Sequence, residues 1–249
     1  MCAPNIQITH AFTTRIGGVS TGVFSTLNLG ANSGDDPSSV RGNYEIVCRA
    51  INISSDDLIG TRQVHGNSVR IVKREDRGKL FLRESIEADG MITNEQGVAL
   101  IVFTADCVPV LLQDPVCSVI SAVHSGWRGT AQDIVGSAVR KMSEAYGSSP
   151  INIRAAIGPS ISKCCYETDS DVANALCSTL SDDVAECCIS MRGDKYMVDL
   201  KEANRILLKR AGLTDIAVSE ECTSCNSCKY WSHRRTKGHR GSQAAIIAL

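Results

Sequence analysis

Apolar residues recur along much of this chain with the period of an α-helix. They occupy positions 40, 44, 47 and 51, directly after Asp36-Pro37, which supplies a capping carboxylate and a proline suited to a first turn. This pattern predicts a helix over residues 37–52. The same period, stopped by Gly147, predicts a helix over residues 129–145. Further helices are expected over residues 169–180 and 199–211.

Shorter apolar runs between these segments predict β-strands over residues 68–73, 98–104, 108–113, 116–124, 151–157 and 244–248. The runs 98–104 and 108–113 are apolar on both faces, so we expect them to be deeply buried. Asp114-Pro115 is a turn dipeptide that should join two strands as a hairpin. Helices and strands alternate irregularly. This predicts an α/β fold, a single layered domain over residues 1–249 with mixed β-sheets packed centrally and flanked by helices.

Charge and hydropathy narrow the range of partners. The chain of 249 residues carries a formal net charge of −1 and has no long run of one sign, so no strong field attracts nucleic acid or a membrane surface. Residues 1–8 lack the pattern of a signal peptide. The most apolar stretch, residues 97–113, is interrupted by Asp106 and Pro109. We therefore expect a soluble, cytoplasmic protein with no nucleic-acid or membrane partner.

Three side chains are candidates for a metal centre. Cys107 and His124 stand at or near the ends of neighbouring expected strands, and His65 occupies a similar strand-to-turn position upstream. One thiolate and two imidazoles can hold Zn²⁺ or copper and leave one coordination position open, as a catalytic site requires. Spacing alone leaves open the alternative that each histidine is structural and the cysteine a core residue.

Several short motifs follow one another along almost the whole chain. They are Phe12-Thr-Thr-Arg-Ile-Gly-Gly-Val-Ser20, Leu27-Asn-Leu-Gly30, Gln63-Val-His-Gly66, Ala88-Asp-Gly90, Thr104-Ala-Asp-Cys107, His124-Ser-Gly-Trp-Arg-Gly129, and Ile157-Gly-Pro159 with Cys165-Tyr-Glu167. Together and in this order they resemble the laccase-domain, or multicopper polyphenol oxidase, family. That family is now regarded largely as purine nucleoside phosphorylases and includes the peptidoglycan editing factors.

The resemblance implies that His65, Cys107 and His124 are the metal ligands and the catalytic centre. It implies a zinc-dependent purine nucleoside phosphorylase, with copper as a possible metal. Its substrates would be phosphate and adenosine, inosine or methylthioadenosine, its products the free base and ribose 1-phosphate. Adenosine deaminase activity is a second implied reaction. The oligomeric state is not implied.

Contacts to substrate and phosphate are expected from Arg15, Asn28, Gln63, Arg128 and Glu167. Arg15 stands beside Gly17-Gly18, where bare backbone can approach an anion. Arg128 precedes an expected helix N-terminus, which also favours an anion. A surface or structural role for each arginine remains open at this point.

Other functions remain as alternatives. The family's editing members suggest a metal-dependent amidase that acts on L-Ser-containing muramic acid precursors, and a related mechanism makes Cys107 a nucleophile with His124 as its base. Copper-dependent polyphenol oxidation is a third possibility. However, the chain has five histidines and no His-X-His pair, too few for blue and trinuclear copper centres. A metal-buffering protein without enzymatic activity is the remaining class.

Two further features leave their roles open. The chain has twelve cysteines, and Cys222, Cys225 and Cys228 form a CxxCxxC run resembling part of a zinc or iron–sulfur motif. Family members commonly carry the first two without a bound cluster.

The carboxylates available as a proton shuttle are Asp106, Asp89 and Glu167. Strand alternation should point Asp106 away from Cys107, which leaves Asp89 and Glu167. The family also often has Gly-Arg where this chain has Gly241-Ser242.

Overall fold

The computed structural model describes residues 1–78, 86–180 and 182–249, in which the strands form three sheets. The six-stranded sheet has the order β12 (Asp215–Val218), β8 (Arg154–Ile157), β6 (Val108–Asp114), β7 (Val119–Ser125), β4 (Gly90–Thr93) and β3 (Val69–Ile71). The four-stranded sheet has the order β1 (His10–Phe12), β13 (Gln243–Ala248), β5 (Ala99–Thr104) and β2 (Leu58–Ile59). A small sheet is formed by β10 (Ile189–Arg192), β11 (Lys195–Val198) and β9 (Glu167–Thr168).

Both larger sheets are mixed. The pairs β12–β8, β3–β4 and β2–β5 are parallel, and the other pairs are antiparallel. The helices are α1 (Pro37–Ala50), α2 (Trp127–Ala131), α3 (Ile134–Tyr146), α4 (Ser170–Thr179), α5 (Asp182–Cys188), α6 (Leu200–Arg210) and α7 (His233–Thr236). Short 3₁₀ turns lie at Gly22–Phe24, Ser55–Asp57, Arg74–Asp76 and Pro150–Asn152. The predicted fold class, mixed sheets flanked by helices, is confirmed.

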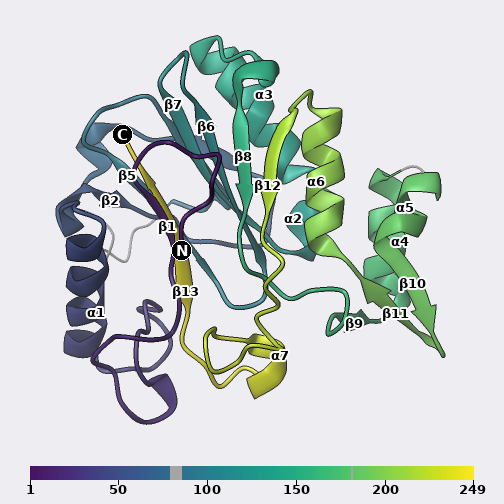
Figure 1. Ribbon diagram of the computed structural model, residues 1–249, viewed down its shortest axis with the longest axis horizontal. Coiled ribbons are helices and arrows are strands. Elements are labelled where there is room, and N and C mark those ends of the chain that lie inside the picture. Colours follow the sequence, from purple (N-terminus) through teal and green to yellow (C-terminus); the bar gives the residue numbers. More distant parts are fainter. Residues whose placement is uncertain (79–85, 181) are drawn as a thin grey trace.

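The two larger sheets pack face to face between helical layers (Figure 1). Side-chain alternation along β5 explains why that strand is apolar on both faces. Leu100 and Val102 join a core between the two sheets, whereas Ala99 and Ile101 pack against α1. On the other side, the six-stranded sheet is covered by α2, α3 and α6, and α4, α5 and the small sheet extend beyond α6 (Figure 1).

Most elements expected from the sequence are present, with ends shifted by a few residues. The helix expected over 37–52 is α1, where Asp36 accepts a hydrogen bond from the Ser39 N–H, and the hairpin at Asp114-Pro115 is β6–β7. One expected helix is wrong in detail. Residues 129–145 do not form one helix, because Asp133 adopts a left-handed conformation (φ 53°) and caps a new helix, α3, through the Gly136 N–H.

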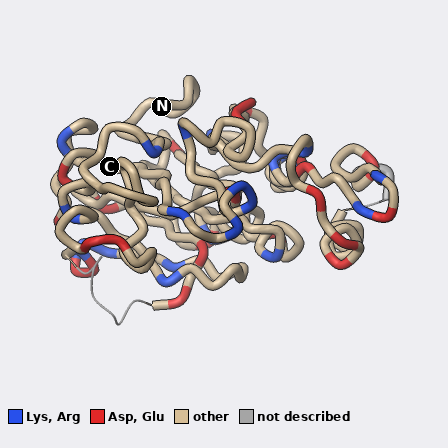
Figure 2. The backbone as a smooth tube through the Cα atoms, turned by 90° about the horizontal axis from the view of Figure 1, so that it is seen from below, with Lys and Arg blue, Asp and Glu red and all other residues tan. Residues whose placement is uncertain are grey.

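Several elements gave no clear signal in the sequence. They are β1, β2, β4, β9 to β12, α5 and α7, most of which are only two to four residues long. The strand expected over 151–157 begins at Arg154, because a 3₁₀ turn starting at Pro150 occupies the preceding residues. Among the described residues, no helix has the length and apolar character needed to cross a membrane. Basic and acidic residues are interspersed along the backbone (Figure 2).

The core between the sheets yields a stability prediction. Leu111 on β6 is fully buried there. Leu111→Ala should therefore lower the free energy of unfolding by about 2–5 kcal/mol, through lost apolar burial and the cavity left behind. Urea denaturation followed by circular dichroism measures this change. Val116→Ala, at a side chain that is 70% exposed, is the control and should change stability little. Equal stability of the two variants would contradict the assigned core.

Candidate metal centre

The fold brings His65, Cys107 and His124 to one point. Cys107 immediately precedes β6, and His124 lies on the adjacent strand β7, opposite Pro109. Cys107 Sγ lies 3.8 Å from His65 Nε2, and the two imidazole rings are 4.9 Å apart in an edge-to-face arrangement. The ligand atoms of all three residues lie within 4.8 Å of one another. This spacing is compatible with one shared metal ion.

A buried carboxylate holds two of these residues in place. Asp89 is 0% exposed, and its Oδ1 lies 2.8 Å from His124 Nδ1. The same carboxylate accepts hydrogen bonds from the backbone N–H groups of Val64, His65 and Gly66 at 2.8–3.1 Å. His65 has a φ of 60°, a conformation that non-glycine residues seldom adopt. Asp89 therefore orients the His124 ring and fixes the turn that carries His65.

The electrostatics favour the ligand form of Cys107, whereas His124 is held protonated and would lose a proton on binding a metal. Burial opposes ionisation of the Cys107 thiol, but the charge of His124 and hydrogen bonds to both imidazoles lower its pKa to about 6. Burial likewise opposes protonation of His124, but Cys107 and Asp89 raise its pKa to about 9. Without a metal the pair is a thiolate beside an imidazolium. Because a thiolate is the form of cysteine that binds metals, Cys107 is ready to act as a ligand near neutral pH.

The space around the three side chains fits a metal ion with one open position. A Cβ atom at Gly126 would lie 2.9 Å from His65 Cδ2 and 3.3 Å from Cys107 Sγ, so only glycine leaves this cradle clear. One sulfur and two nitrogen donors suit Zn²⁺ or copper, and His124 has the outer carboxylate partner typical of metal-binding histidines. These residues therefore fit the metal centre expected from the sequence.

The three side chains open into a cavity of about 620 Å³. Its wall also contains Tyr44 and Phe103, whose rings are 6.3 Å apart, and residues 30–33 and 60–63. This volume is typical of pockets that enclose small molecules. A metal ion held by these three residues would be accessible to a small molecule in the cavity.

Arg240 is a cavity residue that the sequence did not single out. Its Nη1 donates to Gly241 O at 3.0 Å and to Ser242 Oγ at 2.8 Å. Its Nε is buried and has no hydrogen-bond partner among the described residues. Burial lowers the pKa of Arg240, against the opposing effect of Cys107 and Asp106. An unpartnered guanidinium N–H beside a cavity is suited to binding an oxyanion.

Two of the expected substrate residues shape this cavity. Gln63 lies on its wall, and its side-chain amide both donates to Phe103 O (2.8 Å) and accepts from Phe103 N (2.7 Å). Asn28 is fully buried behind the wall, where its Oδ1 accepts hydrogen bonds from the N–H groups of Gly30 and Ser242. Both side chains thus fix backbone that faces the cavity.

The other three expected residues lie outside the cavity wall. The Arg15 guanidinium donates to Ser25 O and Ser227 O and stacks on the Trp231 ring at 3.8 Å. Arg128 is exposed in the first turn of α2 and lies over the Trp127 ring. Glu167, on β9, is exposed and 4.0 Å from Arg192. The structure does not bring these three together with the metal centre.

Asp106 faces away from the metal centre. It has a φ of 93°, and its carboxylate accepts hydrogen bonds from Thr223 Oγ1 (2.6 Å) and from the Arg234 N–H (2.7 Å). The carboxylate thus ties the turn before Cys107 to the C-terminal segment. Asp89, named from the sequence only as a possible proton shuttle, is instead the residue that positions His124. The family often has an arginine where this chain has Ser242. Its absence there was the sequence feature that could have drawn attention to Arg240, two residues earlier.

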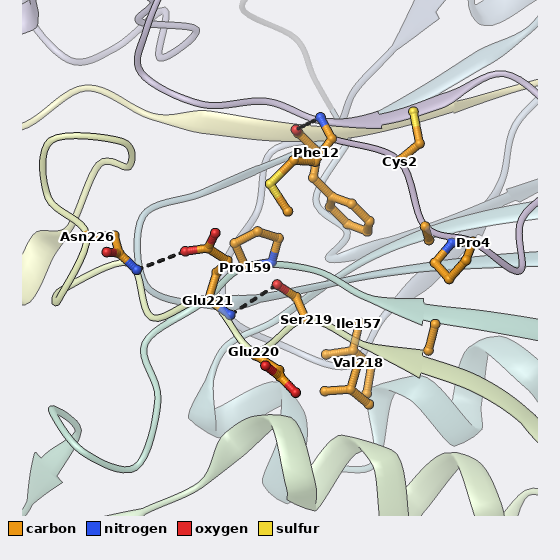
Figure 3. A pocket seen from close by; sticks show the side chains of 13 residues that line it. Cys2, Pro4, Phe12, Ile157, Pro159, Val218, Ser219, Glu220, Glu221 and Asn226 are labelled. Carbon is orange, nitrogen blue, oxygen red and sulfur yellow. Dashed lines mark hydrogen bonds between the residues drawn. The ribbon is translucent and has the colours of Figure 1, made fainter.

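A second cavity, of about 530 Å³, lies beside the start of the chain (Figure 3). Its lining combines apolar side chains such as Phe12, Ile157 and Val218 with Glu220 and Glu221. It contains neither of the two histidines nor the cysteine of the metal centre. The candidate chemistry therefore belongs to the first cavity.

Comparison with known proteins identifies relatives along nearly the whole chain. Residues 9–249 match the family described as "Multi-copper polyphenol oxidoreductase laccase". The purine nucleoside phosphorylase YlmD of Geobacillus stearothermophilus is 37% identical over 94% of this chain and 88% of its own length. A purine nucleoside phosphorylase of Deinococcus radiodurans is 38% identical over 99% of this chain and 91% of its own.

A solved structure shows the same fold. The crystal structure of the hypothetical protein YfiH from Bacillus licheniformis superposes with a TM-score of 0.92 at 35% identity, covering 96% of this chain and 92% of that one.

The role of Asp89 is testable by substitution. Asp89→Asn should lower Zn²⁺ affinity about 10- to 100-fold, because His124 loses the carboxylate that orients it. Competition with a chromogenic chelator measures this affinity. Asp114→Asn is a matched control, because Asp114 is equally buried and bonded to backbone N–H groups but lies at the β6–β7 turn. Unchanged affinity in folded Asp89→Asn would contradict the positioning role.

Proposed function

The chain belongs to the multi-copper polyphenol oxidoreductase laccase family, and we propose that it is a zinc-dependent purine nucleoside phosphorylase. The observation that carries the proposal is the grouping of His65, Cys107 and His124 on the wall of a cavity that is also lined by Arg240, whose Nε has no hydrogen-bond partner among the described residues. Relatives of about 37% identity named purine nucleoside phosphorylases support it.

His65, Cys107 and His124 would hold the metal. When bound, Zn²⁺ supplies a Lewis acid that polarises an oxygen atom in its open coordination position. Asp89 keeps the proton of His124 on Nδ1, so that Nε2 remains a ligand. Gly126 keeps the space between the ligands free of side-chain atoms.

Arg240 would bind the phosphate. Arg240 lines the cavity and its Nε has no hydrogen-bond partner among the described residues, whereas the guanidinium of Arg15 is occupied by backbone carbonyls and Trp231. The sequence alone predicts that Arg15 and Arg128 bind phosphate and that Glu167 contacts the substrate. Hydrogen bonds from a guanidinium to an oxyanion are among the stronger ones in proteins. The structure thus favours Arg240.

The nucleoside would occupy the remaining cavity, with its purine near Phe103 and Tyr44. In phosphorolysis a phosphate oxygen attacks the anomeric carbon of the ribose while the bond from that carbon to the purine nitrogen breaks. The bonding electrons leave with the purine, which takes up a proton. The cavity holds both reactants in one place, which removes much of the entropic cost of their encounter.

Adenosine deamination is the second reaction we propose for the same cavity. In this reaction water attacks C6 of the adenine, the bond from C6 to the exocyclic amino nitrogen breaks, and the products are inosine and ammonia. Polyphenol oxidation is less well supported. Of the five histidines, only His65 and His124 lie in the metal centre, and His10 hydrogen-bonds to the Ala3 N–H at the start of the chain. The three remaining histidines are too few for the blue and trinuclear copper centres that multicopper oxidases require.

Product analysis tests the function. Zinc-loaded protein incubated with adenosine and phosphate should release adenine and ribose 1-phosphate, separable by chromatography. Adenine should not form without phosphate, and inosine in that sample would reveal the deaminase. His124→Ala and Cys107→Ala should lower both activities by at least about 100-fold, because each removes a metal ligand.

The outcomes separate the candidate functions. Adenine released without phosphate would contradict phosphorolysis. Absence of any nucleoside product would contradict the proposal and direct the next assay to L-Ser-containing muramic acid precursors. The His10→Ala variant is the control, because His10 lies outside the metal centre and should leave the products unchanged.

A second prediction concerns phosphate. Arg240→Ala should raise the KM for phosphate about 10- to 100-fold, the loss expected for a charge-assisted hydrogen bond of about 1.5–3 kcal/mol. The KM for adenosine should change much less. Steady-state kinetics with each substrate varied in turn measures both constants.

Arg235→Ala is the matched control, since Arg235 is exposed on α7 and lies outside the cavity wall. A KM for phosphate unchanged in Arg240→Ala, or raised equally in both variants, would contradict the assignment.

A further inference from the structure

A second group of metal-binding side chains lies outside the candidate active site. Cys164 and Cys165, from the loop between β8 and β9, meet Cys222 and Cys225, from the loop between β12 and α7. Their sulfur atoms all lie within 4.8 Å of one another. The CxxCxxC run thus contributes only its first two cysteines, and the other two come from a distant part of the sequence. We propose that these four cysteines form a second, structural zinc site.

The distances suit one tetrahedral ion. A zinc ion bound by four thiolates at about 2.3 Å requires sulfur atoms about 3.8 Å apart. The observed separations are 3.7 Å for Cys164–Cys165, 3.6 Å for Cys164–Cys225 and 3.3 Å for Cys165–Cys225. All exceed the roughly 2.05 Å of a disulfide bond. An iron–sulfur cluster, with sulfide between its irons, needs more widely spaced thiolates.

The backbone around Cys222 is arranged for a thiolate. The Ser162 N–H donates to Cys222 Sγ at 3.4 Å, and a β-bridge joins Ser160 to Cys222. Backbone N–H groups that donate to sulfur stabilise metal-bound thiolates.

The loop that carries Cys222 and Cys225 is braced from outside the cluster. The Glu221 carboxylate accepts hydrogen bonds from Asn226 Nδ2 (2.8 Å) and Lys229 Nζ (2.6 Å), the first of which is visible in Figure 3. The Cys222 carbonyl accepts from the Asn226 N–H. These contacts fix the turn independently of the sulfur atoms. The site is therefore largely formed before a metal binds.

A positive charge lies close to the cluster. Lys201 is only 6% exposed, and its Nζ donates to Ser219 O (2.8 Å) and Glu221 O (3.2 Å), immediately before Cys222. Four thiolates and one zinc ion carry a net charge of about −2, which this ammonium group partly offsets. Asp199 and Glu221 also favour the charge of Lys201, and the proposed zinc site would add to their effect.

Saturated coordination gives the site a structural role. Four protein thiolates leave no position for water or substrate, in contrast to His65, Cys107 and His124. The ion would fasten loop 160–165 to loop 222–225. Both loops contact Asp106: its carbonyl accepts from the Ile161 N–H, and its carboxylate accepts from Thr223 Oγ1. The second site would therefore stabilise the turn before Cys107.

Metal stoichiometry tests the proposal. Protein purified with zinc under reducing conditions and dialysed should contain about two zinc ions per chain by mass spectrometry of the metal. The Cys164→Ser/Cys225→Ser variant and the His65→Ala/His124→Ala variant should each retain about one. Cys228→Ser, which removes a neighbouring exposed cysteine, is the control and should retain about two.

A second measurement does not depend on the folding of the cysteine variant. Cobalt added to His65→Ala/His124→Ala, which keeps all four cysteines, should give the intense thiolate charge-transfer and d–d bands of a tetrahedral site. Absence of these bands would overturn the proposal. The proposal would also be overturned if the wild-type protein contained about one zinc ion and the Cys164→Ser/Cys225→Ser variant retained it. Failure of the phosphorylase assay alone would not affect it, because metal content is measured without substrate.

Discussion

The candidate active site depends on one buried carboxylate. Asp89 has no contact with solvent and accepts hydrogen bonds from three consecutive backbone N–H groups as well as facing His124. Burying a charge is costly unless it is fully paired, so this carboxylate tolerates only one arrangement of its neighbours. That arrangement includes the left-handed backbone of His65. Two of the three proposed metal ligands are therefore positioned by the same group.

The third ligand is positioned from the opposite direction. Cys107 follows Asp106, whose carboxylate is held by Thr223 and by the Arg234 N–H. These partners belong to the segment between β12 and β13, which the proposed cysteine site would fasten to loop 160–165. Asp89 and His124 are thus held by the six-stranded sheet, whereas Cys107 is held by loops. The metal centre lies between these two parts. Through these contacts the proposed cysteine site would also bear on the position of Cys107.

The sequence predicted the long elements better than the short ones. Helix α1 and strands β5 and β6 were predictable because their apolar residues repeat over whole turns or alternate against two cores. The break at Asp133 was not, because it rests on one backbone conformation. His65, Cys107 and His124 were found through motifs, whereas the role of Asp89 and the grouping of Cys164 with Cys225 depend on contacts between distant segments.

The last strand anchors one segment of the cavity wall. β13 is paired between β1 and β5, and the Gln243 side chain exchanges hydrogen bonds with the Trp231 backbone. These contacts anchor both ends of the segment that carries Gly238, Arg240 and Ser242 into the cavity wall. A segment fixed at its ends can change its intervening side chains without disturbing the sheet. Arg240 therefore presents its positive charge in the cavity from a segment that the sheet and Trp231 hold at both ends.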